Sequence, residues 1–300
     1  MFENVLVGVD GSPHGRDAVA LAHRLTDPSS RVALVHVHPG ELRPSHAVVP
    51  GMLKEEREAA EQLLKREAAS AKLPADLVSV VAGSPGRGLH ELAEEREADL
   101  IVVGSSSHGP LGRVLLGDDS RAALNGAPCA VAIAAAGYAE RDHPFANLGV
   151  AYDGSPESEV ALATARDLAQ VSHARVHALE VVPIVTWGYG PMAPLLLNGS
   201  FQAMVTEADA RMKELPGVEG RAVDGLAGEE LAAFGDELDL LIAGSRGYGP
   251  VRRLVLGSTS RYLQRHARCS LLVLPRGVAS AKAARHESHA DEGKAVSTAA

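Results

Sequence analysis

Positive charge and cysteine are both scarce in this sequence of 300 residues. Lysine and arginine number 29 against 38 aspartates and glutamates, which gives a formal net charge of −9. An acidic chain lacks the attraction to phosphate backbones that a general nucleic-acid binder needs, so we expect no nucleic-acid partner. The two cysteines are too few for a disulfide framework or a cysteine-rich zinc site, and they fit a reducing compartment.

Long apolar runs are also missing. No run approaches the roughly 18 residues that cross a membrane, and the N-terminal residues MFENVLVGVDG lack the basic start of a signal peptide. We therefore expect a cytoplasmic protein with no membrane contact. The composition is otherwise that of a globular chain, with 46% hydrophobic and 22% charged residues, and the length suits about two domains.

The chain contains one pattern twice. FENVLVGVDGSP (2–13) matches FANLGVAYDGSP (145–156), and GSSSHGPLGRVLLGDDSR (104–121) matches GSRGYGPVRRLVLGSTSR (244–261) without a gap. The offset between the copies is 143 residues at the first motif and 140 residues at the second, so only small gaps separate them. A repeat of this length indicates two copies of one domain.

We assign the first copy to residues 1–136 and the second copy to residues 145–276. The join around 135–143 is short, so the two copies should pack closely. The tail from 277 to 300 is rich in Ala, Ser, Lys, Glu and His without periodicity, and we expect it to be disordered.

Short, continuous apolar runs alternate with helical patterns in both copies. Such runs are typical of strands buried on both faces of a parallel sheet, and the alternation with helices predicts right-handed βαβ units. The sequence therefore predicts an α/β protein with two tandem five-stranded parallel sheets, each between layers of helices. The expected strands are 4–9, 31–37, 77–81, 100–103 and 129–134 in the first copy, and 148–152, 175–181, 221–223, 238–243 and 270–274 in the second.

The fifth strand of each copy should lie at the edge of its sheet, where unpaired N–H and C=O groups need covering. We expect residues 127–134 and 267–274 to pair within the chain across a pseudo-twofold axis. Cys129 and Cys269 belong to these segments, where a buried thiol is usually inert. His36 and His38 alternate near a strand end, and we interpret them as core or surface histidines rather than a metal pair.

The loops after the first and fourth strands are the candidate binding sites, because ligands of open parallel sheets lie beyond the carboxyl ends of the strands. In the second copy nine residues separate Gly244-Ser-Arg-Gly247 from Gly257-Ser-Thr-Ser260, which stands at an expected helix start. Glycines permit close approach of the backbone, and a helix N-terminus favours phosphate. The alternative is a tight turn followed by an ordinary Ser/Thr N-cap. Neither the Walker A motif nor GxGxxG is present.

These motifs together resemble the universal stress protein family. They are Val-x-Asp-Gly-Ser after the first strand, a valine at the end of the second strand, and Gly-x2-Gly-x9-Gly-Ser/Thr after the fourth. The resemblance covers both copies and implies the Rossmann-like, adenine nucleotide alpha hydrolase-like fold. In ATP-binding members the glycine motif holds the phosphates and ribose, while the aspartate and the valine lie near the adenine. Members commonly associate through the fifth strand, so a homodimer is a further possibility.

The second copy matches the ATP-binding pattern well. The resemblance places Asp153 near the adenine and lets the backbone edge of Val181 bond the base. Arg246 is either a phosphate ligand or a solvated loop residue. The implied ATP contacts are Ala151, Tyr152, Asp153, Val181, Gly244, Arg246, Gly247, Gly257, Ser258, Thr259 and Ser260.

The first copy departs from the pattern. Ser107 stands at the second glycine, and Asp118 stands at the terminal Ser/Thr, where its carboxylate would repel an anionic ligand. We therefore expect the second copy to bind ATP better than the first. The weaker candidate contacts of the first copy are Gly8, Val9, Asp10, Val37, Gly104, Gly109, Gly117 and Ser120.

The resulting hypothesis is an ATP-binding stress-response regulator that takes ATP with or without Mg²⁺ and changes its choice of protein partner. Hydrolysis should be slow at most, because no residue is identifiable as a strong general base and no catalytic or metal-ligating group is indicated. The alternative is a nucleotide-independent scaffold that binds a protein partner. A third hypothesis, an adenylating transferase, would need a catalytic motif that the sequence does not contain.

Overall fold

The computed structural model describes residues 1–38, 52–71, 73–105, 125–141, 144–183, 193–245, 254 and 257–276. The tail that was expected to be disordered, 277–300, lies outside these residues. Within the described part of the chain, no helix is both long enough and apolar enough to cross a membrane.

Strands and helices alternate in the described part of both copies, as the sequence pattern predicts, except before the last strand of the first copy, where residues 106–124 are not described. The first copy contains β1 (Phe2–Gly8), α1 (Pro13–Leu25), β2 (Thr26–His38), α2 (Met52–Ala71), β3 (Asp76–Val81), α3 (Pro85–Glu95), β4 (Leu100–Gly104) and β5 (Ala130–Ala134). The second copy contains β6 (Asn147–Tyr152), α5 (Pro156–Ser172), β7 (Arg175–Pro183), α6 (Ala193–Lys213), β8 (Glu219–Gly225), α7 (Ala227–Phe234), β9 (Leu240–Gly244), α8 (Ser258–His266) and β10 (Ser270–Leu274). Two 3₁₀ turns, η2 (Tyr138–Glu140) and η4 (Gly235–Glu237), complete the described elements.

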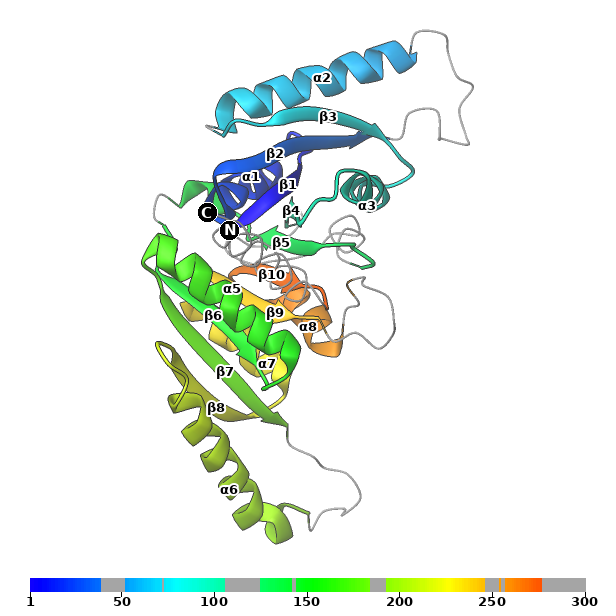
Figure 1. Ribbon diagram of the computed structural model, residues 1–300. Coiled ribbons are helices and arrows are strands. Elements are labelled where there is room, and N and C mark those ends of the chain that lie inside the picture. Colours follow the sequence, from blue (N-terminus) through cyan, green and yellow to red (C-terminus); the bar gives the residue numbers. More distant parts are fainter. Residues whose placement is uncertain are drawn as a thin grey trace, which may run out of the picture.

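The ten strands form one continuous sheet in the order β3-β2-β1-β4-β5-β10-β9-β6-β7-β8 (Figure 1). Each half is parallel, and the two halves join where β5 and β10 run antiparallel, with Leu272 opposite Ala132. The expected pairing of the two fifth strands is therefore present within the chain. Because this pairing covers the inner edge of each half, the edges of the whole sheet are β3 and β8.

The apolar strands contribute side chains to two hydrophobic cores, one on each face of the sheet. Along β5, Ala132 lies in the core that contains α1, α2, α5 and α6, whereas its neighbours Val131 and Ile133 lie in the core that contains α3, α7 and α8. Successive side chains of a strand point to opposite faces. Continuous rather than alternating apolarity is therefore what a sheet covered on both faces requires.

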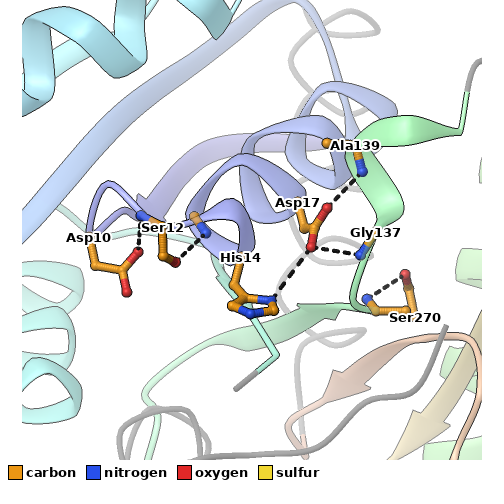
Figure 2. A network of polar contacts seen from close by, with 9 residues as sticks. Asp10, Ser12, His14, Asp17, Gly137, Ala139 and Ser270 are labelled. Carbon is orange, nitrogen blue, oxygen red and sulfur yellow. Dashed lines mark hydrogen bonds and ion pairs between the residues drawn. The ribbon is translucent and has the colours of Figure 1, made fainter. Parts of the chain in front are cut away.

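A buried carboxylate holds the junction between the copies in place (Figure 2). Asp17, on α1, is 2% exposed, and it accepts hydrogen bonds from the backbone N–H groups of Gly137 (2.9 Å) and Ala139 (2.8 Å). Burial raises the pKa of Asp17. The two hydrogen bonds lower this pKa, but the effect of burial is larger. The equivalent residue of the second copy is Val160, whose side chain cannot accept a hydrogen bond. The carboxylate is thus specific to the first copy, whose connecting segment it holds.

We predict that Asp17→Ala lowers the free energy of unfolding by about 2–4 kcal/mol, because it leaves two buried N–H donors without their acceptor. Asp17→Asn should cost less, since its amide oxygen still accepts one of the two hydrogen bonds. Asp27→Ala is the matched control, because Asp27 also accepts from a backbone N–H but is partly exposed at the start of β2. Urea unfolding measures all three variants, and equal losses for Asp17→Ala and Asp27→Ala would contradict the anchoring role.

Candidate nucleotide site

A pocket opens at the carboxyl ends of β6, β7 and β9. The chain's strand order reverses here, since β6 lies between β7 and β9, and such a point is where ligands of open α/β sheets bind. The pocket has an apolar part from the strands and α7 and a polar part from the starts of α5 and α8. It is lined by Ala151, Tyr152, Asp153, Ser155, Glu157, Ser158, Leu179, Val181, Ala227, Leu231, Ala243, Gly244, Gly257, Ser258, Thr259 and Ser260.

Nine of the eleven residues predicted for the second copy line this one pocket. The other two, Arg246 and Gly247, lie outside the described residues. Sequence reasoning missed the apolar wall of the pocket, including Leu179 and Leu231. In the sequence, Leu179 and Leu231 cannot be told from ordinary core residues. Ser155 was also missed, although its place in the repeated Asp-Gly-Ser-Pro motif was a usable signal.

The Asp-Gly-Ser-Pro motif builds the same turn in both copies. Asp153 Oδ1 accepts from the Ser155 N–H (3.1 Å), and Ser155 Oγ caps α5 by accepting from the Ser158 N–H (3.2 Å). In the first copy Asp10 and Ser12 make the equivalent bonds at the start of α1 (Figure 2). An Asx turn followed by a serine N-cap starts the helix directly after the strand. The turn places each aspartate at the carboxyl end of the first strand of its copy.

The first glycine of the long motif is required by helix packing. A Cβ atom on Gly244 would lie 2.7 Å from Glu157 Cβ and 2.8 Å from the Glu157 carbonyl oxygen. A Cβ on Gly104 would lie 2.1 Å from the carbonyl oxygen of His14. Both distances are far below van der Waals contact, so each glycine lets the first turn of a helix pack on the strand end. Its presence in a copy is therefore no sign of ligand binding.

The start of α8 presents uncapped backbone amides to the pocket. Its N-cap is Gly257, and among the described residues no side chain accepts a hydrogen bond from the first amides of α8. The alternative of an ordinary Ser/Thr N-cap is thus wrong, since Ser258 is the first helical residue and its side chain is exposed. Unpaired N–H groups and the positive end of the helix dipole suit an anion here.

The strand β7 extends beyond its neighbour β6. The pairing of β6 with β7 ends at Tyr152 opposite Glu180, whereas β7 continues to Pro183 and pairs there only with β8. Val181 therefore lies inside the strand rather than at its end, which corrects the sequence prediction, and it borders the pocket past the end of β6. In the first copy β2 likewise continues one residue past Val37, to His38.

Charged side chains around the pocket are paired. Glu157 accepts from Arg276 (3.0 Å), and Glu180 accepts from Arg211 (3.1 Å). The Tyr152 hydroxyl donates to Glu159, and this bond raises the pKa of Tyr152 to about 12. Tyr152 therefore stays protonated at neutral pH. Among the described lining residues, the charged ones are Asp153 and Glu157, and both are acidic.

The first copy carries histidines where the second carries these glutamates. His14 takes the place of Glu157 in the first turn of its helix, and His36 takes the place of Glu180 in the second strand of its copy. His36 Nδ1 lies 2.8 Å from the carbonyl oxygen of Val9. The described weaker candidates of this copy lie at or beside the carboxyl ends of β1, β2 and β4: Gly8, Val9, Asp10, Val37 and Gly104. Gly109, Gly117 and Ser120 lie outside the described residues.

Within the described residues, no group of three or more His, Cys, Asp or Glu side chains is arranged to hold a metal ion. The rings of His36 and His38 stack at 6.3 Å, but His38 Nε2 contacts Ser79 Oγ (3.1 Å) while His36 contacts the backbone. Burial raises the pKa of Cys129 and Cys269 to about 12, so both thiols stay protonated. The prediction of buried, inert cysteines agrees with this environment.

The architecture is that of a tandem α/β protein with Rossmann-like half-sheets. A family model described as the universal stress protein family matches residues 1–135 and 144–275. The chain belongs to this family. A universal stress protein of Thermus aquaticus is 31% identical over 134 residues, which cover 44% of this chain and 97% of that protein.

Two further comparisons extend over more of the chain. A universal stress protein of Mycobacterium tuberculosis is 31% identical over 189 residues, covering 59% of this chain and 62% of that protein. The crystal structure of a universal stress protein from Archaeoglobus fulgidus matches with a TM-score of 0.65 at 20% identity, covering 91% of this chain and 98% of that chain. Because the identity is only 20%, the match to the Archaeoglobus fulgidus structure shows a shared fold and nothing more.

Proposed function

We propose that this protein binds ATP in the pocket of the second copy and acts as a nucleotide-dependent regulator in a stress response, with slow hydrolysis at most. We further propose residues 1–136 and 145–276 as its two domains. The observation that supports ATP binding is the composition of this one pocket. It combines an apolar wall with an uncapped helix N-terminus at the switch point of the half-sheet.

The apolar wall suits the adenine base. Ala151, Leu179, Val181, Leu231 and Ala243 line it, and burying a flat base against such side chains removes apolar surface from water. The part of β7 beyond the end of β6 borders the same wall. Its backbone offers hydrogen-bonding groups that can tell one base from another.

The polar part suits the phosphates when Mg²⁺ accompanies them. The amides at the start of α8 attract a phosphate, whereas the Asp153 carboxylate would repel it; the Glu157 carboxylate is already paired with Arg276. Mg²⁺ prefers carboxylate and phosphate oxygens, so it would turn this repulsion into attraction. We therefore expect Mg²⁺-ATP to bind more tightly than ATP with EDTA present.

The first test is the nucleotide content of the freshly purified chain, followed by calorimetric titration with Mg²⁺-ATP. About one ATP per chain is expected, because one pocket carries the full motif. Two per chain would contradict the weaker first copy. No nucleotide, no heat and no thermal stabilisation would favour the nucleotide-independent scaffold instead.

A further inference from the structure

The glycine loop of the second copy is fastened to the first copy by backbone hydrogen bonds. Of residues 246–256, the structure describes Leu254, which lies three residues before Gly257. The Leu254 N–H donates to the Ala127 carbonyl (2.9 Å), and the Gly126 N–H donates to the Leu254 carbonyl (2.9 Å). Both backbone groups of one loop residue are therefore paired across the boundary between the copies.

The Leu254 side chain is also held there. It is 0% exposed and belongs to the core that includes Ala127 and Cys129 of the first copy and Leu263 of α8. On the other side, Gly126 has φ +90°, a left-handed conformation that favours glycine. This turn aims the Gly126 N–H and the Ala127 carbonyl at the same residue.

Leu254 is close to the pocket along the chain. Leu254 lies three positions before Gly257, a span of at most about 11 Å. Gly257 caps α8, and the first residues of α8 line the pocket. A shift of the Gly126–Ala127 turn therefore acts on the phosphate end of the pocket through a short connection. The turn leads into β5, and the pairing of β5 with β10 helps to hold it in place.

We propose that the first copy serves as the positioning element of the nucleotide site in the second copy, acting through Gly126 and Ala127 on Leu254. This inference rests on the proposed function. It gives the first copy a role that does not require a working site of its own. It also couples the two copies, since a ligand that orders the start of α8 tightens the contact with the Gly126–Ala127 turn.

The test compares two glycine variants of the full chain. Gly126→Ala strains the turn in the first copy without a clash, because the nearest atom to its Cβ, His90 Cε1, lies at 3.9 Å. Gly217→Ala is the matched control, since Gly217 has φ +71° and open space around its Cβ, but lies in the turn between α6 and β8. We expect Gly126→Ala to weaken Mg²⁺-ATP binding about tenfold or more, and Gly217→Ala to leave it unchanged.

Amide hydrogen exchange of the wild-type chain provides a second, independent measurement that needs no variant to fold. Mg²⁺-ATP is expected to slow exchange at Gly126 and Leu254. Equal affinities of the two glycine variants, or unchanged exchange at both amides under saturating ATP, would overturn the inference while the proposed function stands. If the wild-type chain binds no ATP, the proposed function fails and this inference fails with it.

Discussion

Ser258→Asp is expected to abolish ATP binding while the protein stays folded. Ser258 is the first residue of α8, its side chain is exposed, and it lines the pocket. A carboxylate placed about 4 Å from a phosphate charge costs on the order of 4 kcal/mol at an effective dielectric constant of 20, so affinity should fall roughly 1,000-fold. At the same position a carboxylate favours the helix dipole, so the free energy of unfolding should rise slightly.

Ser258→Asn is the control, because it has the same shape as the aspartate variant without the charge. Calorimetry with ATP and EDTA is run on both variants, so that no Mg²⁺ bridges the new carboxylate and a phosphate, and urea unfolding is run alongside. The first copy already carries an aspartate at this position, because Asp118 is the equivalent of Ser258. Equal affinities of the two variants would show that phosphate does not bind at the start of α8, and would remove the reason for ranking the second copy above the first.

Gly104→Ala is expected to destabilise the fold severely, by about 3 kcal/mol or more, even though Gly104 belongs to the copy with the poorer site. Its Cβ would overlap the backbone of α1, at 2.1 Å from the carbonyl oxygen and 2.6 Å from the carbonyl carbon of His14. Backbone atoms inside a packed helix cannot move aside as a flexible side chain can. A requirement that came from ATP alone would leave this variant stable.

Gly83→Ala is the control for that prediction, because a Cβ on Gly83 would have nothing within 4 Å. Urea or thermal unfolding measures both variants. A Gly104→Ala variant as stable as Gly83→Ala would mean that α1 shifts at little cost, and the packing explanation of this glycine would be wrong.

The position of the pocket was predictable because it depends on strand order and local turns. The repeated Asp-Gly-Ser-Pro motif marks the start of a helix directly after a strand, and the structure places Asp10 and Asp153 in identical turns there. The apolar wall was not predictable. Leu231 meets Val181 at the pocket only because α7 packs over β7, and nothing in its local pattern separates it from any other core leucine.

The sequence by itself determined the repeat, the alternation of strands and helices, and the glycine and serine positions near the site, because these depend on residues close together in the chain. Only the tertiary structure decided what each glycine is for. Gly244 and Gly104 permit helix packing, since the atoms that exclude a Cβ belong to a distant helix. The contacts at the junction between the two copies also depend on the tertiary structure. Asp17 lies about 120 residues from the N–H groups it accepts from, and Leu254 about 127 from its partners, so no local pattern could reveal either contact.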